Sequence, residues 1–264
     1  MKKHSRRINR IAWLIFGGLI LLLALAFLEN DFKWDGKRDM RIGIITDENL
    51  AVLVISPERR MINRVETSAR TPIFIGRGYG WYEADKVKKL LIQEKKPTLA
   101  EEIFFYNFGI IPDKIEWQDR GVTPESLGLL GFFRLRLNEA NYLRNKEILG
   151  ENREENEALL DEVAVRDLAD SNLLQANIKV TVYNGSEVSG LAAFLGKRLD
   201  WFGFTVIGTD NSPDKDDDYC RINASEKIRI DLPWNCDLTI DKSLNIDEIE
   251  IYFGEKFAEM LQYQ

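Results

Sequence analysis

The feature that most constrains this chain of 264 residues is an apolar run near its N-terminus. Residues 11–28, IAWLIFGGLILLLALAFL, carry no charged side chain. At about 1.5 Å per residue, a helix of that length crosses the apolar layer of a thin bilayer. Five basic residues precede the run, and Glu29 and Asp31 follow it. This charge bias keeps residues 1–10 in the cytoplasm and exports everything after the run.

The sequence therefore predicts a single-pass protein of the cell membrane. Residues 1–10 form a basic cytoplasmic tail, residues 11–28 a transmembrane helix with the lipid bilayer as its partner, and residues 29–40 a polar stalk. The alternative is a signal peptide cleaved after Ala26, because Ala24-Leu25-Ala26 has the small-x-small pattern that signal peptidase recognises. We favour the anchor, since the apolar run is longer than the usual core of a signal. Both interpretations export the remaining residues.

Charge and histidine content exclude several classes of function. Of the 36 Lys and Arg residues, five lie in the tail, which leaves 31 against 43 Asp and Glu in the exported part, a net charge of −12. Such a surface repels nucleic acid, so no nucleic-acid partner is expected. The one histidine, His4, lies in the tail. The exported part therefore lacks the histidine that a Ser-His-Asp triad, a Cys-His pair or a histidine-ligated zinc needs, and we expect no catalytic residues.

An acidic stretch at residues 214–218 is a candidate metal site. Asp214-x-Asp216-x-Asp218 has the opening spacing of a calcium-binding loop, but Tyr219 stands where the turn glycine is required and Ser225 where the bidentate glutamate belongs. A solvated loop fits this pattern better than a metal site. We expect no metal and no other cofactor.

The middle of the chain predicts a mixed α/β domain at residues 41–145. Apolar, β-branched runs separated by turn residues predict strands at residues 41–45, 51–56, 61–67 and 72–75. Helical spacing follows from Ala84 onward, and Thr98-x-x-Glu101 has the pattern of a capping box that opens a second helix ending at Gly109. Residues 146–175 begin with a dense run of charges, so we interpret them as a charged linker or helix between two domains.

Residues 176–264 predict a second, smaller α/β domain. Residues 178–183 alternate as a half-buried strand, Asn184-Gly185 supplies a turn, and Ser186 is a candidate cap for a helix that ends at Gly203. Strands at residues 204–207 and 249–253 complete a βαβ-containing unit. Cys220 and Cys236, 16 residues apart on the exported side, predict a disulfide, with two free thiols as the alternative.

The C-terminal pattern resembles the LytR C-terminal domain, a small α/β module of bacterial envelope proteins. The resemblance covers residues 176–260 and rests on three segments: Val180-x-Val182-x-Asn184-Gly185-Ser186-x-x-x-Gly190-Leu191-Ala192, Gly203-Phe204-x-Val206 and Asp247-x-Ile249-x-Ile251-x-Phe253-Gly254. Residues 40–112 resemble a degenerate fragment of the LytR-CpsA-Psr catalytic domain. Only Arg70 stands near the position of that family's motif arginine, without the neighbouring proline and aspartate.

The junction between strand and helix in this domain is the candidate binding site. Asn184, Gly185, Ser186 and Gly190 precede the helix, whose first N–H groups lack partners within the helix and are able to hold an anionic group of a wall polymer or a lipid head. The alternative is a tight turn that simply requires small residues.

Three functions are compatible with these patterns, of which the third is a sensory or scaffold subunit of a larger membrane complex. The first is a non-enzymatic, membrane-anchored envelope protein whose C-terminal module binds cell-wall polymer or a partner protein. The second, which the resemblance of residues 40–112 implies, is a divergent LytR-CpsA-Psr phosphotransferase that attaches glycopolymers to the wall. The transferase requires a lipid-sized apolar cleft with arginines at its mouth.

Overall fold

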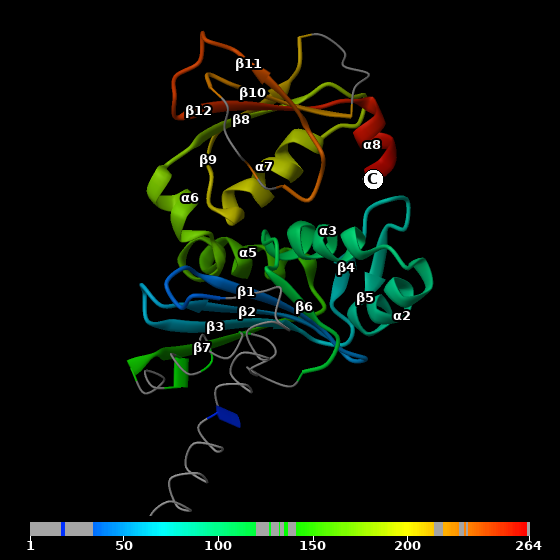
Figure 1. The fold of residues 1–264 in the computed structure, drawn as a ribbon. Helices are drawn as coiled ribbons and strands as arrows, with labels where there is room; N and C mark the ends of the chain where they lie inside the picture. The colour runs from blue at the N-terminus through cyan, green and yellow to red at the C-terminus, as the bar shows by residue number, and fades with distance from the viewer. Residues whose placement is uncertain are drawn as a thin grey trace, which may run out of the picture. The chain divides into compact units, whose positions relative to one another are not determined.

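The computed structural model describes residues 17–18, 34–119, 127, 132, 135–136, 141–213, 219–226, 230 and 232–262 (Figure 1). The predicted transmembrane helix at residues 11–28, apart from Gly17 and Gly18, and the acidic loop at residues 214–218 lie outside this set. Within it, no helix has the length and apolarity needed to cross a membrane. The chain divides into two compact units, and the larger one comprises residues 39–119 and 142–264.

The first sheet of the larger unit has five strands. In spatial order they are β6 (Lys114–Glu116), β1 (Met40–Ile45), β2 (Leu50–Ser56), β3 (Met61–Thr67) and β7 (Leu143–Leu149). Strands β1, β2 and β3 pair antiparallel, whereas β6 and β7 join the edges in parallel. Every residue of β1 and β2 is buried. Burial on both faces explains why these strands are apolar runs without alternation.

A small hairpin and two helices follow β3. The hairpin consists of β4 (Pro72–Phe74) and β5 (Trp81–Glu83), and the helices are α2 (Ala84–Glu94) and α3 (Pro97–Phe108). The predicted capping box at Thr98 is wrong: α3 begins at Pro97, because proline suits the first turn of a helix, and Lys96 precedes it without a side-chain cap. The predicted end at Gly109 is confirmed, with a left-handed φ of 65°.

Strand β7 covers the first four residues of the predicted linker at residues 146–175. Strand β7 pairs with β3 along its whole length, and Leu149 at its end is buried. Lys146 lies 2.5 Å from Glu66 on the neighbouring strand. Residues 146–149 therefore belong to the first sheet, where Lys146 lies exposed on an edge strand. Three helices follow: α5 (Arg153–Val163), the π-helix η2 (Ala164–Leu168) and α6 (Ser171–Ala176).

The second sheet also has five strands. In spatial order they are β11 (Asp237–Ile240), β10 (Cys220–Ala224), β12 (Glu248–Phe253), β8 (Lys179–Asn184) and β9 (Thr205–Asn211). Helix α7 (Leu191–Phe202) connects β8 to the parallel β9, and α8 (Glu255–Leu261) follows β12. The predicted βαβ unit is therefore present, and Gly203 ends its helix. Fold class is mixed α/β throughout.

Helices α3 and α7 lie between the two sheets (Figure 1). Helix α3 is apolar on several sides: Phe104 and Phe108 join the core beneath the first sheet, whereas Phe105 and Tyr106 join the core beneath the second. Both sheets therefore bury side chains of one shared helix, α3. The sequence could not show this, since each strand and helix carries its own local pattern.

A buried arginine links the two halves. Arg198 of α7 donates hydrogen bonds to the carbonyl oxygen of Tyr106 at 2.9 Å and to Glu157 of α5 at 3.1 Å. Its guanidinium lies 4.8 Å from the ring centre of Trp201. The Trp234 indole N–H donates to the Tyr106 hydroxyl at 2.9 Å. Polar groups at this contact are thus satisfied, as burial requires.

Candidate functional site

The structure brings two of the four predicted binding residues into one pocket. Asn184 and Gly190 line a cavity of about 190 Å³ at the start of α7. The other lining residues come from α7 and from the end of β9: Ala192, Ala193, Thr209, Asp210 and Asn211. Gly185 and Ser186 do not line it. Because side chains alternate along β9, Thr209 and Asn211 face the α7 side while Asp210 faces the other side of the sheet, so hydroxyl and amide groups are the polar side chains that line this cavity.

The predicted helix cap at Ser186 is wrong. The Ser186 hydroxyl and N–H both donate to Asn184 Oδ1, at 2.7 Å and 3.0 Å, and Asn184 Nδ2 donates to the Val188 carbonyl at 2.8 Å. These bonds form an Asx turn, a local alternative to helix capping. The helix starts at Leu191 after Gly190, which has a left-handed φ of 81°. The residues of this junction therefore form a turn, and two of them, Asn184 and Gly190, also line the pocket.

A row of side chains crosses the face of the second sheet that lies opposite α7. Strand register pairs Arg221 with Tyr252, Tyr252 with Tyr183, and Tyr183 with Asp210. Strands β8 and β12 alternate between buried and partly exposed residues, and both tyrosines fall on the partly exposed side. This face therefore has no covering layer among the described residues.

The tyrosines of this row stack on each other. The ring centres of Tyr183 and Tyr252 are 4.7 Å apart and their planes are 16° from parallel. Tyr252 donates from its hydroxyl to Glu250 at 2.9 Å. Burial raises the pKa of both hydroxyls, and the Glu250 carboxylate raises both further. Both tyrosines therefore stay protonated at neutral pH, and the single O–H of Tyr252 is already donated to Glu250.

Sequence analysis missed this row, although one signal was present. The alternation at residues 178–183 and 249–253 assigns the aliphatic residues of each run to the buried face. Tyr183 and Tyr252 then fall on the opposite face. The pattern does not show that the two strands are neighbours, because β8 and β12 lie far apart in the sequence.

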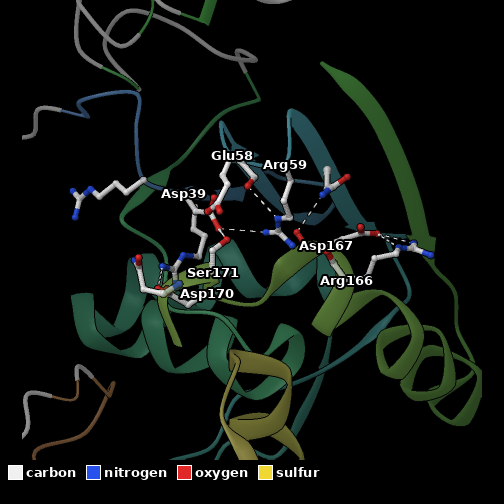
Figure 2. A network of polar contacts seen from close by, with 12 residues as sticks. Asp39, Glu58, Arg59, Arg166, Asp167, Asp170 and Ser171 are labelled. Carbon is white, nitrogen blue, oxygen red and sulfur yellow. Dashed lines mark hydrogen bonds and ion pairs between the residues drawn. The ribbon is translucent and has the colours of Figure 1, made fainter. Parts of the chain in front are cut away.

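A second cluster contains the arginines and carboxylates that a phosphotransferase would use (Figure 2). Arg41 and Asp170 form an ion pair, Arg59 lies 3.3 Å from Asp39, and Arg166 lies 2.6 Å from Asp167. Each of these three arginines is thus matched by an aspartate, and these pairs of described residues carry no net positive charge for a pyrophosphate. The Ser171 hydroxyl also donates to Asp39.

This cluster ties the η2–α6 segment to the first sheet. The Arg59 guanidinium donates to the carbonyl oxygen of Arg166, and Asn63 Nδ2 donates to that of Asp167 at 3.2 Å. Burial raises the pKa of Asp170, but the neighbouring Arg41 and two backbone N–H groups outweigh this and leave the pKa below its ordinary value. Asp170 also caps α6. The arrangement is that of a structural clasp.

Other features of a transferase site are also missing from the described part of the chain. Arg70, which the resemblance places near the motif arginine, is 73% exposed and lies 4.0 Å from Glu151. A pocket lined by Arg153 and Arg198 measures about 30 Å³. That volume suits about one water molecule and excludes a lipid chain.

Cys220 and Cys236 form a disulfide. It joins the start of β10 to the residue before β11, with the two Cα atoms 4.6 Å apart. Cys220 is buried among the aromatic side chains of the second core, beside Trp234 and Phe253. The bond therefore holds the edge strand β11 close to its neighbour β10.

Comparison with protein families gives one match. Residues 177–253 match the family model of the LytR C-terminal domain, which is described as "LytR cell envelope-related transcriptional attenuator". The match begins just before β8 and ends with the last residue of β12, so it covers the second sheet and α7. No curated protein sequence matches the chain.

Proposed function

From the LytR C-terminal domain that this chain carries at residues 177–253, we infer a cell envelope-related protein without enzymatic activity, tethered to the membrane, that binds cell-wall polymer. Residues 11–28 form the tether in this proposal, and the rest of the chain lies outside the cytoplasm. The apolar run and its charge bias support the anchor. The disulfide supports an oxidising compartment, because such bonds are rare in the cytosol.

The observation that carries the binding role is the unequal coverage of the two sheets. Strands β1 and β2 of the first sheet are buried throughout, whereas the second sheet leaves one face partly exposed, with aromatic and polar side chains in register across it. Such a face, next to a polar pocket at the end of β8, offers the mixture of ring surface and hydrogen-bonding groups that recognition of a polymer requires.

The phosphotransferase remains the competing proposal. It draws on the resemblance of residues 40–112 to the LytR-CpsA-Psr domain. The charge-matched clasp and the exposed Arg70 disfavour it, because transfer of a phosphoryl group needs cationic groups aimed at the leaving pyrophosphate. An experiment that measures both wall binding and phosphate release separates the two proposals.

The test uses the full-length chain in a mild detergent. It is incubated with isolated cell-wall sacculi and, separately, with a polyprenyl-pyrophosphate glycolipid and Mg²⁺. We expect the chain to pellet with the sacculi and to release no phosphate from the lipid. Turnover of the lipid would replace this proposal by the transferase. Binding to neither would exclude both a wall-binding module and a transferase.

The anchor is tested by fractionation. If residues 11–28 remain attached, the chain stays with the membrane after washing with high salt and alkaline carbonate, and protease added to spheroplasts digests all but the N-terminal segment. A soluble product that begins after Ala26 would show a cleaved signal peptide and would overturn the tether.

A further inference from the structure

The stacked row on the second sheet has one unused aromatic face. The Arg221 guanidinium lies 4.7 Å from the ring centre of Tyr252 and comes from β10, whereas Tyr183 comes from β8 on the other side of β12. Both faces of the Tyr252 ring are therefore occupied. Among the described residues, Tyr252 is the one ring that stacks on Tyr183. The second face of Tyr183 thus points towards the edge strand β9.

Strand β9 leaves space beside that face. Gly208 pairs with Thr181, and Asp210 pairs with Tyr183, so Gly208 and Asp210 lie two residues apart on the same side of the sheet. Thr209, which lies between them, faces α7. Its methyl carbon is so near Gly196 of that helix that a Cβ added to Gly196 would lie 2.7 Å from it. A Cβ at Gly208 would have one neighbour within 4 Å, Thr181 Cγ2 at 3.5 Å. The Tyr183 ring, the bare backbone of Gly208 and Asp210 thus border an open slot.

The groups around this slot select a class of ligand. An exposed ring face next to carboxylate acceptors suits a pyranose, whose C–H face lies on the ring while its hydroxyls donate to the acceptors. Two carboxylates are the hydrogen-bond acceptors here. Asp210 belongs to the row, and Glu250 lies next to it, two residues from Tyr252 on β12. Because both are negative, they repel a phosphate-containing polymer and favour a ligand with hydroxyl or ammonium donors. The cationic Lys179 of β8 is paired with Asp247 at 2.8 Å.

We propose that the slot between Tyr183 and Gly208 binds one sugar ring of a phosphate-free wall glycan, stacked on Tyr183 with its hydroxyls donating to Asp210. This assignment rests on the proposed wall-binding function and adds its site and the chemical class of its ligand. It also places the ligand on the opposite face of the sheet from the helix start that the sequence suggests.

The test compares binding of the full-length chain in detergent to two preparations of sacculi. One is untreated, and the other is stripped of phosphate-linked polymers by hydrofluoric acid. We expect both preparations to bind the wild type equally. Binding to untreated sacculi alone would overturn the assignment and leave the proposed function standing, whereas binding to neither would overturn both.

Two variants test the slot itself. Tyr183→Ala removes the ring, and Gly208→Val fills the space while the ring stays; we expect each to weaken binding to stripped sacculi by about tenfold. Valine suits an edge strand at this position, because a Cβ there meets only ordinary contacts. Tyr183→Phe keeps the ring and should bind within about twofold of wild type.

The matched control is Tyr142→Ala, which removes a partly buried tyrosine outside the second sheet. It should leave binding unchanged. Circular dichroism and the thermal midpoint establish that each variant folds. If Gly208→Val folds and binds stripped sacculi as tightly as wild type, the slot is not the site.

Discussion

The two sheets of this protein have the same number of strands but are covered differently. In the first sheet every residue of β1 and β2 is buried, and their sequences are apolar apart from Arg41 and Ser56. In the second sheet β8 and β12 alternate, with aliphatic residues against α7 and polar or aromatic residues on the other side. A sheet buried on both faces serves as a scaffold, whereas a sheet covered on one face keeps a surface for a ligand.

Charged residues show the same contrast. Around the first sheet, arginines and aspartates pair with one another in the clasp of Figure 2, which joins β1 and the β2–β3 turn to the η2–α6 segment. On the second sheet, Arg221 stacks on a tyrosine ring, and Asp210 lies beside Tyr183 and two residues from the uncrowded Gly208. Paired charges stabilise a fold, whereas acceptors beside an exposed ring are available to a ligand.

The largest expected effect comes from the helix contact that both sheets share. Gly109 ends α3 with φ of +65°, and a Cβ there would overlap the Cβ of Trp201 on α7. We predict that Gly109→Ala lowers the free energy of unfolding by about 3 kcal/mol, from overpacking and left-handed strain together. Urea unfolding followed by tryptophan fluorescence and by circular dichroism measures it.

Gly80→Ala is the matched control for that substitution. Gly80 has a similar φ of +70°, but a Cβ there would meet nothing within 4 Å. Gly80→Ala should lower the free energy of unfolding by about 1 kcal/mol, which is the cost of the left-handed backbone strain alone. If Gly109→Ala costs no more than Gly80→Ala, the contact between α3 and α7 does not join the two halves, and the comparison of two sheets on one shared layer fails.

A somewhat smaller effect should come from the disulfide, which touches the second sheet alone. Reduction of Cys220–Cys236 opens a loop with a sequence separation of 16 residues. We predict a loss of about 3 kcal/mol or slightly less, mainly because the unfolded chain gains freedom. Urea midpoints with and without dithiothreitol measure it, and a Cys220→Ser/Cys236→Ser variant should not respond to the reductant. Equal midpoints for the wild type would show that the second sheet does not depend on the bond.

The smallest effect should come from the clasp, and it should depend on pH. Because the pKa of Asp170 is lowered in the folded state, its ionised form stabilises the fold. That contribution is complete above the ordinary value of 3.8 and is lost as the pH falls through the lower folded pKa. Asp170→Asn keeps a capping oxygen for α6 but removes the charge, and should cost about 1–2 kcal/mol at neutral pH.

The measurement is a set of urea titrations of wild type and Asp170→Asn between neutral and acidic pH. The difference in unfolding free energy between the two proteins should shrink as the pH falls. Other carboxylates with a lowered pKa, such as Glu66 and Glu157, affect both proteins equally. A difference that stays constant with pH would mean that the Asp170 charge contributes nothing to the clasp.

Local sequence patterns predicted many of the elements correctly. The strand at residues 61–67 has the predicted bounds, the helices end at Gly109 and Gly203, and the βαβ unit of the second sheet is present. These features depend on periodicity and on glycine in the left-handed region, which act over a few residues. The helix starts were less accurate, because Pro97 and an Asx turn replaced the caps expected at Thr98 and Ser186.

The candidate site was predicted only in part. Asn184 and Gly190 do line a pocket, but Tyr183, Tyr252, Arg221 and Asp210 were not identified. Their alternation was visible, yet their meeting depends on the spatial order β10-β12-β8-β9, in which β12 separates β10 from β8 although it follows both in the sequence. Strand order and register are set by packing of the whole sheet, which a local pattern does not contain.

By itself, then, the sequence determined seven of the strands, the helix ends at Gly109 and Gly203, the apolar N-terminal run and the family of the C-terminal domain. Tertiary structure alone decided three things: that β7 pairs with β3, that both sheets share α3, and that an arginine, two tyrosines and an aspartate form one row. Each joins segments far apart along the chain; Asn63 and Asn145, for example, are 82 residues apart and share a hydrogen bond. Such contacts form because burial is gained over the whole fold, and no short stretch of sequence records which partner a face will meet.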